Sequence, residues 1–133
     1  MPYIINRLSD APIIFITQSG SGVIHELNEY LPQVAALLDE QTEPVYLVFD
    51  VRAISITLDE LTLAAHLAAG DQGAVLHHPN VIETLLATTA GAVKLAAQGV
   101  RTAAFGGAKI RTFDTPEQAL AYCHEQIALA AGR

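Results

Sequence analysis

Hydrophobic residues form a nearly continuous run near the middle of the chain. Residues 45–51 read Val-Tyr-Leu-Val-Phe-Asp-Val, without the alternation of apolar and polar positions that marks a strand with one face in water. A strand that helices cover on both faces has this composition, and such strands occupy the centre of a sheet. The run therefore predicts a central strand over Val45–Val51, with Asp50 near its carboxyl end.

Four further short segments also have strand composition. They are rich in β-branched and aromatic residues, and they cover Tyr3–Leu8, Pro12–Gln18, Val81–Thr88 and Lys109–Phe113. Only Ser9-Asp10-Ala11 separates the first two, so no helix fits between them. We expect these two strands to be antiparallel neighbours.

Apolar residues three and four positions apart fill the remaining intervals. They predict helices over Glu29–Gln41, from Thr57 to a stop at Gly70, from Gly91 through Gly99 to Gly106-Gly107, and from Thr115 to the end of the chain. In the first helix Asn28 would be the N-cap and Pro32 would fall in the first turn, although the helix could also begin nearer His25. Gly99 could interrupt the third helix, since glycine disfavours helix interiors.

Two of these helices begin with a capping box, in which a hydroxyl and a Glu or Gln three residues later satisfy each other's backbone amides. Thr57 and Glu60 form the first pair, and Thr115 and Gln118 the second. The last helix is expected to bury one face, made of Ala119, Tyr122, Cys123, Ile127 and Ala130.

The resulting order, β-β-α-β-α-β-α-β-α, defines the fold class. One antiparallel entry followed by β-α-β units with right-handed crossovers gives an α/β fold with a mixed five-stranded sheet and helices packed on it. No linker, repeat or low-complexity tract divides the 133 residues, which is the size of one domain. We expect residues 1–133 to form a single domain.

Composition narrows the possible partners. Fourteen acidic residues against seven basic ones give a net charge of −7, and the basic residues are scattered singly along the sequence from Arg7 to Arg133. Such a chain repels nucleic acid and anionic lipid. The apolar segments are too short to span a bilayer, no signal peptide is evident, and Cys123 has no partner for an intramolecular disulfide. We expect a cytoplasmic protein, and its 51% hydrophobic content suggests a homodimer.

Candidate binding residues lie where open α/β sheets bind ligands, at the carboxyl ends of parallel strands. Asp50, Arg52 and Thr88 occupy such positions. Asp50 could orient a polar ligand or an arginine of a partner, but the favoured interpretation is structural, as a cap on backbone amides or a partner of Arg52. The turn Ser19-Gly20-Ser21-Gly22 could cradle a phosphate, yet it lacks the third glycine of a dinucleotide fingerprint and the Gly-Lys of a P-loop, so a flexible turn is preferred.

No catalytic or metal-binding set emerges. The five histidines are not spaced as ligands on one helix; they are His25, His66, His77, His78 and His124. Cys123 falls on the apolar face of the last helix, where a thiol is usually inert. The sequence does not identify a nucleophile, a base and an oxyanion donor that would converge on one site. We therefore predict no catalytic residue, no metal and no cofactor.

The strand order, the strand that ends near Asp50 and the helix that begins seven residues later resemble the STAS domain, the fold of bacterial anti-sigma factor antagonists. The chain is more closely similar to the SpoIIAA-like group of small stand-alone bacterial proteins. His78-Pro79-Asn80-Val81 and the segment from Phe113 to Leu120 carry that likeness, which spans most of the chain. The resemblance implies a STAS/SpoIIAA-like fold and a regulatory protein partner.

The resemblance also draws attention to the start of the second helix. In the antagonist family, an Asp-Ser-Ser-Gly motif there carries a serine that a partner kinase phosphorylates. This chain has Ile56-Thr57-Leu58-Asp59-Glu60 instead, with no serine pair and no glycine. Ser55 and Thr57 are the nearest hydroxyls, and a phosphate on Thr57 would face the two acids of the same turn. A capping role for Thr57 is therefore preferred to a phosphorylation switch.

Two functions follow as expectations. The leading one is a non-catalytic regulatory or protein-interaction domain, a homodimer whose contact edge includes Asp50, Ser55 and Thr57. The alternative is a binding module for a small apolar or anionic ligand, lodged between the Gly20 turn, Asp50 and Thr88. A cavity of several hundred Å³ at the strand ends would favour the second, and a closed, alanine-filled edge would count against it.

Overall fold

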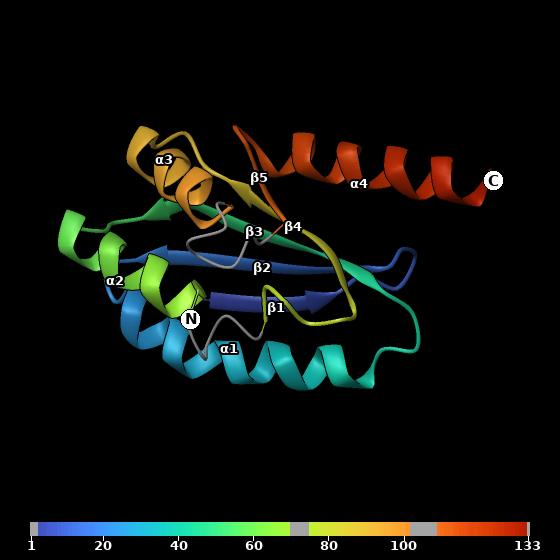
Figure 1. Ribbon diagram of the computed structural model, residues 1–133, viewed down its shortest axis with the longest axis horizontal. Helices are drawn as coiled ribbons and strands as arrows, with labels where there is room; N and C mark the ends of the chain where they lie inside the picture. Colours follow the sequence, from blue (N-terminus) through green and yellow to red (C-terminus); the bar gives the residue numbers. More distant parts are fainter. Residues whose placement is uncertain (1–2, 70–74, 102–108, 133) are drawn as a thin grey trace.

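The computed structural model describes residues 3–69, 75–101 and 109–132. Within these ranges the chain forms five strands and four helices in the order expected from the sequence (Figure 1). The elements are β1 (Tyr3–Arg7), β2 (Ile13–Gly20), α1 (Val23–Glu40), β3 (Val45–Ile54), α2 (Leu58–Ala69), β4 (Val81–Ala87), α3 (Gly91–Val100), β5 (Ile110–Phe113) and α4 (Pro116–Ala131).

The strands form one mixed sheet in the order β1-β2-β3-β4-β5. β1 runs antiparallel to β2, and the other neighbours are parallel. The antiparallel pairing of the first two strands is therefore confirmed, and so is the central place of β3. At the middle of the sheet, Phe49 lies opposite Ile16 of β2 and Leu86 of β4.

Helices cover both faces of this sheet, with α1, α2 and α3 on one side and α4 on the other (Figure 1). Alternate residues of β3 point to the two sides: Leu47 and Phe49 pack with α1, and Tyr46 and Val48 pack with α4. All five residues from Val45 to Phe49 are buried. Burial of both faces explains why this strand is a continuous apolar run.

Helix α1 begins at Val23, six residues before the predicted start at Glu29 and two before the alternative start near His25, and its N-cap is Gly22 rather than Asn28. Pro32 therefore lies inside the helix, not in its first turn. Proline removes one backbone hydrogen bond there, but Pro32 is exposed, so the freed carbonyl can be hydrated. The apolar spacing within Glu29–Gln41 predicted the helix correctly, whereas the expected positions of its N-cap and of Pro32 were wrong.

Other boundaries shift by a few residues. β3 continues to Ile54 because it keeps pairing with β2 as far as Gly20. α3 runs through Gly99 and ends at Val100, short of the predicted end at Gly106-Gly107, and both residues 102–108 and the predicted stop at Gly70 lie outside the described residues. Ala130 is exposed rather than buried, because the end of α4 extends beyond the sheet (Figure 1).

Candidate functional site

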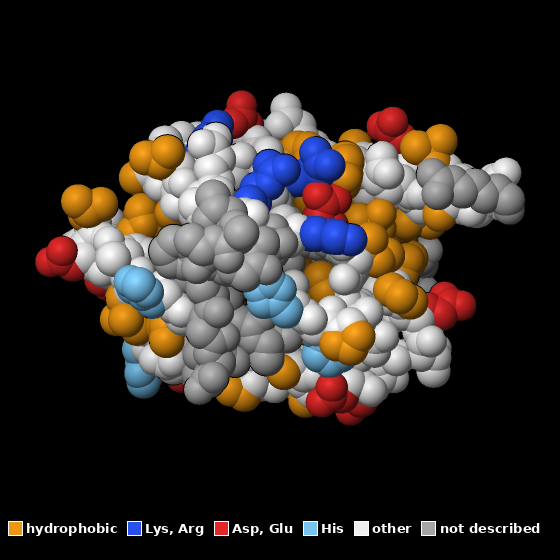
Figure 2. All heavy atoms as spheres, viewed as in Figure 1, with side chains coloured by type: hydrophobic (Ala, Val, Ile, Leu, Met, Phe, Trp, Pro, Cys, Tyr) orange, Lys and Arg blue, Asp and Glu red, His pale blue; other side chains and the backbone are white. Residues whose placement is uncertain are grey.

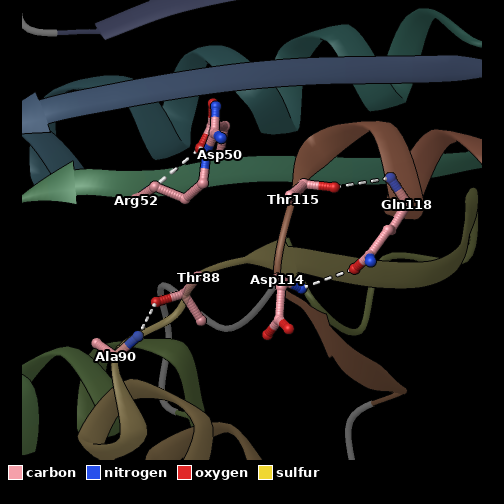
Figure 3. Close-up of polar contacts among 7 residues, drawn as sticks. All are labelled: Asp50, Arg52, Thr88, Ala90, Asp114, Thr115 and Gln118. Carbon is pink, nitrogen blue, oxygen red and sulfur yellow. Dashed lines mark hydrogen bonds and ion pairs between the residues drawn. The ribbon is translucent and has the colours of Figure 1, made fainter.

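Asp50 and Arg52 form an ion pair within one strand. Because β3 extends to Ile54, Asp50 lies inside the strand rather than at its end. Its carboxylate accepts hydrogen bonds from the Arg52 backbone N–H at 3.2 Å, from Nε at 2.9 Å and from Nη2 at 3.1 Å (Figure 3). These contacts raise the pKa of Arg52 above its ordinary value, chiefly through the hydrogen bond to Asp50. The structural interpretation of Asp50 therefore fits the observed geometry.

Ser55 and Thr57 lie together in the exposed connection between β3 and α2. The Ser55 backbone N–H donates to the Gly20 carbonyl at 2.8 Å, which fixes the connection against the end of β2. The Thr57 Oγ1 accepts from the Glu60 N–H at 3.2 Å, and the Glu60 Oε1 accepts from the Thr57 N–H at 3.0 Å. The predicted capping box of α2 is confirmed, so the Thr57 hydroxyl already has a structural partner.

Thr88 is separate from this edge. Its side chain is almost fully buried, and its Oγ1 accepts from the Ala90 N–H at 3.1 Å (Figure 3). Its own N–H donates to the Phe113 carbonyl at 2.8 Å. Thr88 therefore shapes the turn from β4 into α3, and the predicted site residues separate into an ion pair, an exposed loop and a buried turn.

The second capping box is confirmed in one half and altered in the other. Thr115 Oγ1 accepts from the Gln118 N–H at 3.2 Å, as predicted for the start of α4. The Gln118 Oε1, however, accepts from the Asp114 N–H at 3.1 Å, one residue before the expected amide (Figure 3). The Gln118 side chain still caps the start of α4, because the Asp114 N–H, like the expected Thr115 N–H, lies just before the first helical turn.

The glycine-rich turn lies closer to a helix than the sequence suggested. Gly20 has a φ of +88°, a conformation that favours glycine, and α1 begins immediately after Gly22. A carboxylate of the chain itself occupies this helix N-terminus: Glu26 Oε2 would lie 3.1 Å from a Cβ placed on Gly22. An internal acid at this position disfavours a bound phosphate.

Of the candidate reactive groups, Cys123 is buried and His78 is paired. Burial raises the pKa of the Cys123 thiol to about 12. His78 links the segment before β4 to α1, because its Nε2 lies 2.8 Å from Asp39 Oδ1 while its Nδ1 accepts from the Asn80 N–H. Within the described ranges, no three His, Cys, Asp or Glu side chains come together as they would around a metal ion.

A cavity of about 150 Å³ lies between the sheet and helices α1, α2 and α3. Val51 of β3, Leu61 of α2 and Ala97 of α3 contribute to its walls, whereas Asp50 and Thr88 do not. Alternation along β3 is the reason, because Phe49 and Val51 point to the cavity and Asp50 points to the opposite face of the sheet. The sequence did not predict this cavity, because the expected binding site was placed around Asp50, on the other face of the sheet.

Folding brings three basic residues, which lie close together in the sequence, to an acidic residue of another strand. Arg101, Lys109 and Arg111 line one shallow hollow with Glu83, and Figure 2 shows the basic side chains surrounding an acidic one. Glu83 forms an ion pair with Arg111 and accepts a hydrogen bond from the Tyr122 hydroxyl at 2.6 Å. Three of the seven basic residues therefore share one place, although the chain is acidic overall.

The capping box makes a testable prediction about Thr57. Replacement by alanine removes the acceptor for the Glu60 N–H, and we expect the free energy of unfolding to fall by about 1 kcal/mol. For a domain of this size the melting temperature should fall by about 3–5 °C, measured by circular dichroism. Thr57→Ser keeps the hydroxyl and should remain close to wild type. Equal losses in both variants would contradict the capping role.

Comparison with known proteins supports the fold alone. No protein-family model matches the sequence, and no curated protein matches it. Among solved structures, the chain is similar to an uncharacterized protein of the DUF3478 family with a SpoIIAA-like fold from Shewanella loihica PV-4. The similarity has a TM-score of 0.59, covers 91% of each chain and is accompanied by 13% sequence identity.

The chain therefore has a SpoIIAA-like α/β fold, as the sequence predicted. At 13% identity the similarity establishes architecture and leaves the partner and ligand to the residues themselves. None of the helices in the described ranges is both long and apolar enough to cross a membrane.

Proposed function

We propose that this protein is a non-catalytic regulatory domain that acts by association with another protein molecule, and that it forms a homodimer through α2 and the connection before it. Residues 1–133 act as one domain in the cytoplasm. The carrying observation is an exposed leucine surface at one end of the molecule, made of Leu58, Leu63 and Leu95, which are 74%, 47% and 69% exposed.

The leucine surface spans two neighbouring helices. Leu58 and Leu63 lie on α2, Leu95 lies on α3, and these helices pack beside each other. Figure 2 shows hydrophobic side chains at the left-hand end of the molecule, over these helices. Leu58 immediately follows the capping residue Thr57, so the surface adjoins the loop that the sequence singled out. Covering such leucines removes apolar area from water, which favours association.

Charge should influence this association. Each copy carries a net charge of −7, so two copies repel each other at long range. Salt screens that repulsion without weakening apolar contact. We therefore expect the dimer to become tighter as the salt concentration rises, in contrast to an interface made of opposite charges.

Phosphorylation of Thr57 is not part of the proposed mechanism. Its hydroxyl caps α2, and Asp59 and Glu60 add negative charge in the same turn. A phosphate there would gain from the helix N-terminus but would meet those acids. The proposal is therefore an association that needs no phosphorylation step.

Neutral substitutions test the leucine surface. Leu58→Gln with Leu63→Gln removes apolar area and adds no charge, and glutamine is a good helix former. Size-exclusion chromatography with light scattering should find a dimer for the wild-type protein. The dissociation constant should rise at least tenfold in the double variant, which corresponds to about 1.4 kcal/mol.

Leu129→Gln is the matched control, because Leu129 is 52% exposed on α4, which covers the other face of the sheet. This variant should dimerise like the wild-type protein. The homodimer would be disproved by a wild-type protein that stays monomeric at every concentration and salt level. An unchanged dissociation constant in the double variant would instead show that another surface forms the contact.

A further inference from the structure

We propose that the cavity between the sheet and helices α1, α2 and α3 binds a small uncharged apolar molecule that carries one hydrogen-bonding group, and that Thr84 Oγ1 is the partner of that group. Leu58, Leu63 and Leu95 belong to the same two helices, α2 and α3, but they are exposed and do not line the cavity. The proposal does not depend on protein association.

The size and the walls of the cavity set the class of ligand. Its volume is about 150 Å³, and an apolar cavity of about that size holds a benzene ring. Valine, leucine, isoleucine and alanine side chains make up most of the walls, with contributions from every helix on this side of the sheet. Ile54, Ile56 and Leu61 are only half-buried, so the cavity adjoins the connection between β3 and α2.

Two of the three polar side chains in the walls already have hydrogen-bond partners within the protein. Among the described lining residues, only Gln18, Tyr30 and Thr84 are polar. The Tyr30 hydroxyl donates to Gln18 Oε1 at 2.9 Å, and Gln18 Nε2 donates to the Val23 carbonyl at 3.2 Å. These two side chains therefore satisfy each other and the backbone of α1.

Thr84 differs from them. It is fully buried, and its Oγ1 has no hydrogen-bond partner in the part of the chain that the structure describes. A buried hydroxyl without a partner costs folding free energy, and such groups are rare in folded proteins. Because Thr84 lines the cavity, rotation about its Cα–Cβ bond would turn the hydroxyl towards a ligand that carries a hydroxyl or carbonyl group.

The electrostatics of the walls exclude an anionic ligand. The described lining residues include no Lys, Arg or His to neutralise a carboxylate or a phosphate. The buried carboxylate of Glu26 lies 3.3 Å from Gln18 Nε2, at the margin of the cavity. A negative ligand would lose its hydration without gaining a counter-ion, so the ligand should be neutral.

Benzene and phenol serve as matched probes, because they differ by one hydroxyl. Each probe should raise the melting temperature of the wild-type protein, and phenol should bind more tightly than benzene. In Thr84→Val, a methyl group replaces the hydroxyl at nearly constant shape. This variant should bind phenol about tenfold more weakly and should bind benzene at least as well as the wild-type protein.

A cavity-filling variant tests the location. Ala97 is buried on α3 and lines the cavity, so Ala97→Leu should abolish the thermal shift from both probes. Ala92→Leu makes the same change at an exposed position of α3 and should respond like the wild-type protein. In the unmodified protein, nuclear Overhauser effects between the phenol ring and the Thr84 methyl group should place the probe, even if Ala97→Leu fails to fold.

Three results would overturn the proposal. If neither probe shifts the melting temperature of the wild-type protein, or if Ala97→Leu binds both probes normally, the cavity is not a binding site. If both probes bind but Thr84→Val keeps the preference for phenol, Thr84 is not the polar partner.

Discussion

Replacement of Leu47 by alanine is expected to lower the free energy of unfolding by about 3 kcal/mol. Leu47 lies in the middle of β3, is fully buried and belongs to the core between the sheet and α1. The substitution removes buried methyl groups and leaves a void, because strands on both sides prevent β3 from collapsing into the space. Urea unfolding followed by circular dichroism should give a lower midpoint with an unchanged slope.

Leu129→Ala provides the control for this result. Leu129 is 52% exposed near the end of α4, and alanine is an excellent helix former, so the change should stay within about 0.5 kcal/mol. If the two substitutions had equal effects, β3 would not be the centre of the core.

The Cys123 thiol is expected to react at least about a thousandfold more slowly in the native protein than in the unfolded chain. Cys123 is fully buried against Val48 and Tyr46, so a reagent can reach it only after the protein opens. Burial also raises its pKa to about 12, with a smaller effect from Glu83. At pH 8 only about one thiol in ten thousand would then be ionised.

Labelling with an aromatic disulfide reagent, with and without urea, measures this protection. Cys123 is the chain's single cysteine, so one site gives the whole signal. A matched variant, Cys123→Ala with Ala121→Cys, moves the thiol to an exposed position of the same helix, where it should react rapidly. Rapid labelling of the native wild-type protein would contradict the burial of this face of α4.

The raised pKa of Cys123 also makes the stability of the fold depend on pH. Folding raises the pKa of Cys123 from 9.0 to about 12, so the native state holds this proton more tightly than the unfolded state. The contribution is complete below about pH 9 and is lost as the pH rises towards 12. Tyr122 acts in the same direction, because its burial also raises its pKa to about 12.

Short-range signals in the sequence were enough to predict the elements and their order. The apolar run from Val45 to Phe49 identified the central strand, because only burial on both faces tolerates such a run. The hydroxyl and the acid that cap α2 lie three residues apart, so their contact is decided locally. Pro32 misled the placement of α1, since a proline on an exposed helix face can be accommodated.

The candidate sites were harder to predict from the sequence than the strands and helices. The alternation of β3 sends Asp50 to the face opposite the cavity, although it lies beside residues that line the walls. Glu83 and Arg111 lie far apart in the chain and form an ion pair only because β4 and β5 are neighbours in the sheet. The sequence by itself determined what depends on neighbouring residues: the strands, the helix caps and the α/β order. Only the tertiary structure decided which distant side chains share a hollow and that Thr84 lines a cavity, because these contacts depend on strand order and helix packing.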